Sequence, residues 1–213
     1  GTVGAFLAEG IRKSRGSILC FLDDDDLFYP TKLEVLEREF FRNPRVGYYH
    51  NYWRTFEAGG SFEDVTLRGD MAIARRVIVR KDSSSFADVM KRRRWITPFN
   101  LSCVSVRREV ANPYLSYLSE IKAATDAFFI VLAFISNFDV VFSNVPLSHY
   151  RIHVSYSRPD RSNIVDYCKM VSSHSRIYSD SLSVILGIVS DSEVRSIIEA
   201  QIVWWKIRAA VFG

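Results

Sequence analysis

The sequence predicts an α/β fold, and three patterns carry the prediction. Ile18–Leu22 is a run of five apolar residues, which is typical of a strand buried on both faces. Residues 30–41 form an amphipathic helical pattern, and residues 99–106 alternate between apolar and polar side chains, as in a strand with one packed face. From Arg161 onward the spacing of apolar residues is helical throughout.

The remaining chain fits the same alternation of elements. In the helix at 30–41, Leu33, Leu36 and Phe40 recur at helical spacing and are the expected buried face. We expect the other elements to be a helix within residues 1–16, strands at 46–53, 71–80 and 138–142, one long helix at 117–136 and a helix that starts at Asp191.

The composition indicates the size of the fold, the charge of its ligands and the location of the protein. The chain has 213 residues, of which 48% are hydrophobic, enough for one domain with a substantial core or for one domain plus a small helical appendage. The net charge of +4 favours an anionic ligand slightly and does not by itself indicate nucleic acid. Three widely spaced cysteines predict reduced thiols. No signal-peptide pattern or membrane-length apolar run is found, so we expect a cytoplasmic protein.

Four consecutive aspartates, Asp23–Asp26, follow the first predicted strand. Their like charges repel one another, and a bound divalent cation would relieve the repulsion. Mg²⁺ and Mn²⁺ prefer carboxylate oxygens and usually share their coordination shell with substrate phosphates. The stretch therefore predicts a metal–phosphate site, with a solvated acidic turn as the alternative.

This part of the chain resembles family 2 glycosyltransferases of the GT-A fold. The residues that carry the resemblance are Gly10-Ile11, Gly16, Ile18–Leu22, Asp23-x-Asp25-Asp26, Pro30 and Lys32-Leu33-Glu34. The resemblance implies a transferase that uses a nucleotide-sugar donor, with a DxD motif that holds Mn²⁺ or Mg²⁺ on the donor diphosphate. Asp25 and Asp23 would then be metal ligands, and Asp23 and Asp24 would face the diphosphate.

The family usually carries a first strand and a first helix before this point, and Leu7-Ala8 stand where it often has Arg-Asn. The expected fold is therefore a GT-A-like three-layer α/β/α sheet that lacks its first strands, over residues 1–158, with a C-terminal helical extension over 159–213. Loss of the first strands would expose a sheet edge, which favours a homodimer.

Two further segments resemble the same family. Its members often place a Glu-Asp pair at the start of a helix below the acceptor, where the Asp is the general base. Thr125-Asp126 stands there in this chain, so the resemblance implies that Asp126 is the base. The stretch Val145–Ser157 resembles the segment that follows in the family, which implies that Arg151 contacts the donor diphosphate and that His153 completes the metal site. A tyrosine-rich strand with satisfied polar residues is the alternative reading of that stretch.

The expected function is metal-dependent, inverting transfer of a sugar to a saccharide or lipid-linked acceptor. Two other classes compete with it: a non-catalytic binding module that uses the basic run Lys91–Arg94, and an aspartate-nucleophile phosphatase. No nucleic-acid partner is expected. Trp204-Trp205-Lys206 and Arg208 give the last helix an amphipathic character that suits a peripheral contact with the inner face of the membrane.

Overall fold

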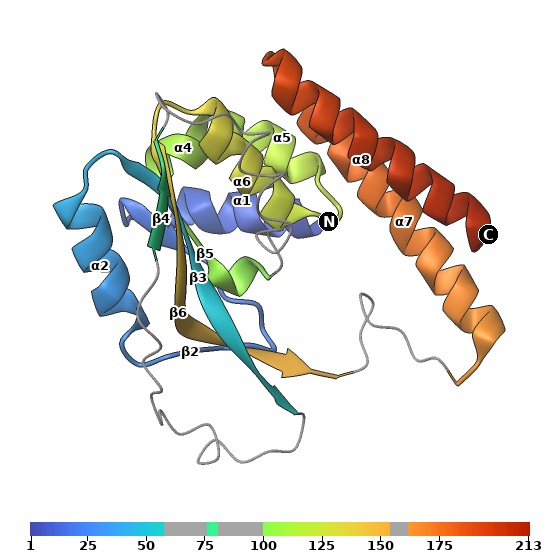
Figure 1. Ribbon diagram of the computed structural model, residues 1–213, viewed down its shortest axis with the longest axis horizontal. Coiled ribbons are helices and arrows are strands. Elements are labelled where there is room, and N and C mark those ends of the chain that lie inside the picture. The colour runs from blue at the N-terminus through green and yellow to red at the C-terminus, as the bar shows by residue number, and fades with distance from the viewer. Residues whose placement is uncertain (58–75, 81–99, 154–161) are drawn as a thin grey trace. The chain divides into compact units, whose positions relative to one another are not determined.

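The computed structural model describes residues 1–57, 76–80, 100–153 and 162–213. The helices are α1 (Val3–Lys13), α2 (Lys32–Arg42), α4 (Arg108–Ala111), α5 (Leu115–Glu120), α6 (Thr125–Ile135), α7 (Ile164–Leu186) and α8 (Ser192–Val211), with short 3₁₀ turns at Leu101–Cys103 and Asn112–Tyr114. The strands are β1 (Ile18–Cys20), β2 (Leu27–Phe28), β3 (Val46–Glu57), β4 (Arg76–Val79), β5 (Val104–Arg107) and β6 (Asp139–Ile152) (Figure 1).

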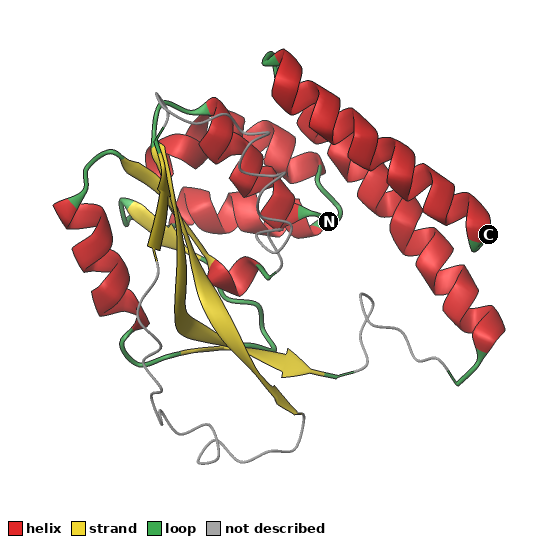
Figure 2. Ribbon diagram, in the orientation of Figure 1, coloured by secondary structure: helices red, strands yellow, loops and turns green. Residues whose placement is uncertain are grey.

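The chain divides into two compact units, each built from separate stretches of sequence. One unit consists of Gly1–Ser14, Tyr114–Val131 and His153–Gly213, and the other of Arg15–Pro113 and Leu132–Ile152. We call them the helical unit and the sheet unit, because the described strands all lie in the second (Figure 2).

The sheet unit contains a mixed sheet in the order β1-β5-β3-β6-β2, and β4 also pairs with β6. The long strands β3 and β6 run parallel, from the pair Val46–Asp139 to the pair Glu57–Ile152. The other described pairs are antiparallel. This register pairs β2, directly after the aspartates, with His149 and Ser148 of β6.

Helix α2 packs on this sheet through its apolar face. Leu36 and Phe40 form a buried cluster with Val46 and Tyr49 of β3 and with Val141 and Leu147 of β6. Burial of such side chains contributes about 2 kcal/mol each relative to exposure. The loop that carries the aspartates, between β1 and α2, is therefore held at both ends by packed elements.

In the helical unit, Thr2 caps α1, since its Oγ1 accepts a hydrogen bond from the Ala5 N–H at 2.9 Å. The Gly4 N–H donates to the Ile121 carbonyl at 3.0 Å, which ties α1 to the residues after α5. Helices α7 and α8 lie side by side (Figure 1). Asp191 caps α8 by accepting from the Glu193 and Val194 N–H groups, as the sequence predicts.

Three predictions about local structure are wrong in detail. The strand predicted at Ile18–Leu22 ends at Cys20, and Leu22 is 50% exposed. In α2, Leu33 is 59% exposed, whereas Lys32 is fully buried in its place. The helix begins at Lys32 rather than at Pro30. Lys32, Leu36 and Phe40 share the inward face because they are spaced four residues apart.

The long helix predicted at 117–136 is two helices. The connection between α5 and α6 spans residues 121–124, and Ala124 has a φ of 61°, in the left-handed region. The apolar periodicity continues across the break, since Ile121, Ala124 and Phe128 are all buried. Asp126 therefore lies in the first turn of α6 instead of inside a long helix.

The basic run Lys91–Arg94 lies outside the described residues. Across the residues that the structure does describe, none of the helices combines the length and the apolar character needed to cross a bilayer.

Candidate active site

The aspartates Asp23–Asp26 form a tight turn between β1 and β2. The Asp26 N–H donates to the Asp23 carbonyl at 3.2 Å, which closes the turn. The Asp23 N–H donates to Ser102 Oγ at 2.9 Å and so ties the turn to the residues before β5. Asp24 is exposed, Asp23 and Asp25 are half-buried, and Asp26 is buried. The first three carboxylates are thus partly open to solvent on a backbone that is fixed.

Arg151, near the end of β6, holds the same turn from the other side. Its backbone N–H donates to Asp26 Oδ1 at 3.0 Å, and its Nε donates to the Asp25 carbonyl at 2.8 Å. Its guanidinium carbon lies 4.6 Å from the centroid of the Phe56 ring. The structure therefore brings Arg151 together with the aspartates, and part of its side chain fixes their backbone.

The environment of the turn disfavours ionised carboxylates. Burial raises the pKa of Asp23 to about 6. The charges of the three aspartates that follow add to this rise in pKa, and the hydrogen bond with Ser102 opposes it. Burial also raises the pKa of Asp26, against the opposing effect of the Arg151 N–H. A cation bound at the turn would stabilise the charged forms of both groups.

A buried polar network lies beneath the turn. Lys32 Nζ donates to the Ser102 carbonyl and to Ser148 Oγ, the latter at 3.0 Å, and lies 3.9 Å from the centroid of the Phe28 ring. Ser148 Oγ donates to the Ser102 carbonyl at 2.7 Å and accepts from Asn51 Nδ2 at 3.0 Å. Ser102 is the link, since its carbonyl faces the lysine and its hydroxyl faces the aspartate turn.

Burial lowers the pKa of Lys32 to about 8, while nearby Cys103, Cys20 and Asp26 act to raise it. The lysine is therefore mostly protonated at neutral pH and is a buried positive charge close to the acidic turn. Sequence reasoning missed this network. Its members are separated by up to 116 residues. Lys32 and Ser148 lie in stretches that the sequence analysis singled out, but no local pattern indicates that they join a buried network with Ser102 and Asn51.

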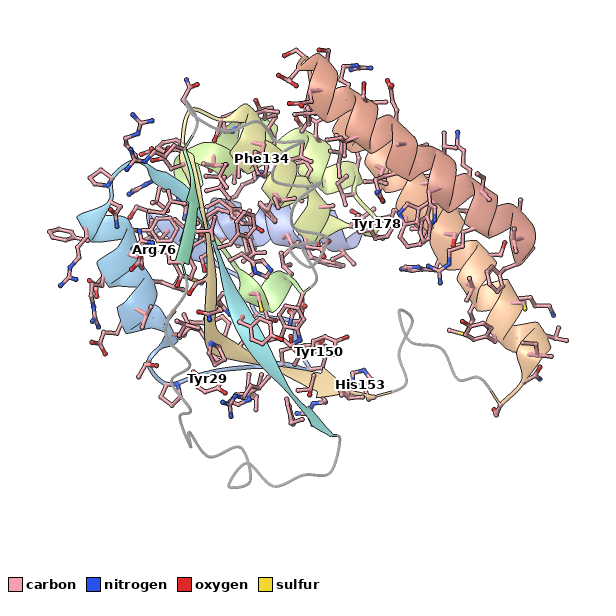
Figure 3. All side chains as sticks on the ribbon, in the orientation of Figure 1. Tyr29, Arg76, Phe134, Tyr150, His153 and Tyr178 are labelled. Carbon is pink, nitrogen blue, oxygen red and sulfur yellow. The ribbon has the colours of Figure 1, made fainter. Side chains whose placement is uncertain are left out.

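Asp126 and His153 belong to the helical unit. Asp126 is half-buried in the first turn of α6, where Oδ1 accepts from the Ala127 N–H at 2.8 Å. A carboxylate is favoured there by the positive end of the helix dipole. Burial raises the pKa of Tyr178, which projects from α7, and the charge of Asp126 adds to that effect (Figure 3). His153 directly follows β6 and is also half-buried (Figure 3).

The sequence model of glycosyl transferase family 2 matches residues 3–114, which include the aspartate turn, α2 and Ser102. The chain belongs to glycosyl transferase family 2.

This family 2 chain also resembles a solved structure, residues 1–349 of S. aureus TarS, with a TM-score of 0.51 and 12% sequence identity. The match covers 100% of this chain and 52% of that one, so the chain spans about half the length of the TarS structure. At this identity the likeness is one of fold. No curated protein matches the chain. Together with the family match, the likeness confirms a GT-A-like α/β fold with C-terminal helices.

The residues of the turn fit a divalent cation by their chemistry. They offer several carboxylate oxygens on a fixed backbone, which is the donor type that Mg²⁺ and Mn²⁺ prefer. Among the described residues, no group of three or more His, Cys, Asp or Glu side chains is arranged to hold a metal.

Proposed function

We propose that this chain transfers a sugar from a nucleotide-diphosphate donor to an acceptor hydroxyl, with Mn²⁺ or Mg²⁺ and with inversion at the anomeric carbon. The observation that carries the proposal is the fixed aspartate turn in a chain of family 2. Asp25 and Asp23 would hold the cation, with His153 as a further ligand, and Asp23, Asp24 and Arg151 would face the donor diphosphate. When bound, the cation would neutralise charge on the departing nucleoside diphosphate.

The proposed chemistry is a single displacement. The Asp126 carboxylate takes the proton of the acceptor hydroxyl while that oxygen forms a bond to the anomeric carbon. The bond from that carbon to the diphosphate oxygen breaks, and its electron pair leaves with the nucleoside diphosphate. Attack by one nucleophile from the face opposite the leaving group inverts the configuration. Support for Asp126 comes from its place in the first turn of α6, which favours a carboxylate.

The partners follow from this reaction: a nucleotide-sugar donor and a saccharide or lipid-linked acceptor. The same proposal includes a cytoplasmic location and a peripheral membrane contact through α8. It also includes a homodimer and a division of the chain into two domains between residues 158 and 159. The half-exposed Trp204 and the adjacent Lys206 and Arg208 of α8 support the membrane contact.

Isothermal titration calorimetry tests the donor site directly. The whole chain is titrated with UDP, GDP and dTDP, each with and without Mn²⁺, and the titrations are repeated on Asp25→Ala. The matched control is Asp180→Ala, since Asp180 is an exposed acid on α7. We expect metal-dependent binding of at least one nucleotide that Asp25→Ala loses and Asp180→Ala keeps. Binding that needs no metal, or that survives Asp25→Ala, contradicts the proposal, and no binding at all favours a non-catalytic binding module.

A further inference from the structure

The loop that leads into Asp126 has an unfavourable backbone conformation. Ala124, two residues before Asp126, has a φ of 61°, and a side chain with a Cβ adopts this left-handed region only where the surroundings hold it there. The Ala124 carbonyl accepts from the Phe128 N–H at 2.9 Å, which is the first hydrogen bond of α6. The position of Asp126 thus depends on what fixes residues 121–124.

One side chain of α7 fixes the middle of this loop. Ser181 Oγ accepts hydrogen bonds from the N–H groups of Lys122 and Ala123, at 3.3 and 3.1 Å, and donates to the Ile177 carbonyl at 2.9 Å. Ser181 is only 2% exposed. From this buried position the hydroxyl satisfies two loop N–H groups, so its loss would leave both without a protein partner.

The same face of α7 also lies near Asp126 itself. Tyr178 is three residues before Ser181, so the two side chains are neighbours on the helix surface. The Tyr178 ring stacks on Trp205 of α8 at 4.3 Å between centroids. The negative charge of Asp126 adds to the rise in the pKa of Tyr178 that burial causes. Helix α7 therefore contacts the loop that leads into the first turn of α6, where Asp126 lies.

We propose that Ser181 is a positioning residue for Asp126, which it places by holding the N–H groups of Lys122 and Ala123. The inference rests on the proposed function, in which Asp126 is the general base. It gives α7 a part in catalysis, and α7 belongs to the same compact unit as Asp126.

The test compares two buried serines of α7, of which Ser181 bonds to the loop and Ser175 bonds within its own helix. Ser181→Ala removes the acceptor, and Ser181→Cys keeps nearly the same volume with a much weaker acceptor. Ser175→Ala is the matched control, because Ser175 is also buried and donates to the carbonyl four residues earlier, Val171, at 2.6 Å. Within the described residues, the hydrogen bond of Ser175 stays inside α7.

The first measurement does not depend on activity. Amide hydrogen exchange of Lys122 and Ala123, followed by NMR in the whole chain, should become about tenfold faster in both Ser181 variants, which corresponds to loss of one hydrogen bond at each amide. Exchange in Ser175→Ala should match the wild type. Equal exchange rates in the Ser181 variants and the control would overturn the inference.

The second measurement separates this inference from the proposed function. Release of nucleoside diphosphate is measured with the sugar nucleotide selected from a screen of UDP-, GDP- and dTDP-sugars. We expect Ser181→Ala and Ser181→Cys to lower kcat about tenfold with little change in KM, and Ser175→Ala to keep both. If Asp126→Asn abolishes release while the Ser181 variants keep the wild-type kcat, the inference fails alone. If Asp126→Asn keeps the wild-type rate, the base assignment and the inference fail together.

Discussion

At the scale of single residues, Lys32 shows how a helix register decides what lies under a site. Its side chain occupies the inward position that hydrophobic periodicity assigns to Leu33. There it places a positive charge beneath four aspartates and binds Ser102, whose hydroxyl accepts from the Asp23 N–H. A buried lysine is costly to desolvate, and its hydrogen bonds and its nearness to Asp26 compensate in part.

Replacement of this lysine should destabilise the protein. Lys32→Met keeps the apolar stem and removes the two hydrogen bonds to Ser102 and Ser148, so we expect the free energy of unfolding to fall by about 2 kcal/mol. Urea denaturation at pH 7 measures this change. Lys13→Met, at an exposed position of α1, should stay within about 0.5 kcal/mol of the wild type. A Lys32→Met protein as stable as the wild type would show that the network contributes nothing.

Asp23 should make stability depend on pH between about 4 and 6. Its pKa is raised from 3.8 to about 6 in the folded protein, so in this range the native state keeps a proton that the unfolded state has lost. Stability contributed by the protonated carboxyl is therefore lost as pH rises through this window. Asp23→Asn cannot titrate, and we expect a flatter stability profile from pH 4 to 7 in urea denaturation. A profile as steep as that of the wild type would place the titration elsewhere.

At the scale of elements, the sequence predicts which segments are helix and strand better than it predicts their ends. Residues 117–136 have an unbroken apolar period, and alanine at 124 is a strong helix former, so nothing local indicates the break there. The break is imposed by tertiary hydrogen bonds, from Gly4 to the Ile121 carbonyl and from the loop to Ser181. Such partners are remote in sequence and leave no periodic signal.

The candidate site also contains residues that the sequence predicts and residues that it does not. The aspartate turn and Arg151 could be anticipated, because a charged run after a strand and a local motif both lie in continuous sequence. Ser102, Ser148 and Asn51 could not, since each is an ordinary polar residue until strand pairing brings it to Lys32.

Contact between α1 and α5 gives a prediction at this scale. A Cβ on Gly4 would lie 1.9 Å from the Leu118 carbonyl oxygen, whereas a Cβ on Gly10 of the same helix would meet nothing within 4 Å. We expect Gly4→Ala to destabilise the protein by about 3 kcal/mol and Gly10→Ala to stabilise it by about 0.5–1 kcal/mol. Thermal unfolding of the two variants measures the difference. Similar shifts for both would mean that α1 does not approach α5 so closely.

At the scale of the whole molecule, the proposed donor site links ligand binding to stability. A ligand that binds only the native state raises the free energy of unfolding by about 2.7 kcal/mol at a hundred times its Kd. We expect the nucleotide identified by calorimetry to raise Tm with Mn²⁺ present. EDTA should reverse the shift, and Asp25→Ala should not show it. A shift that persists in EDTA would indicate a nucleotide site that does not use the aspartate turn through a metal.

The discontinuous helical unit has a consequence for biosynthesis. Thr2 Oγ1 donates to the Ser119 carbonyl at 2.6 Å across 117 residues of chain. At the usual speed of translation, α1 emerges on the order of ten seconds before α5 exists. During that interval the apolar side chains of α1, Ala8 and Ile11 among them, have none of their later neighbours in the helical unit. The first helix of the nascent chain therefore stays unpacked until α5 has been synthesised. During this interval its apolar side chains are accessible to a ribosome-associated chaperone.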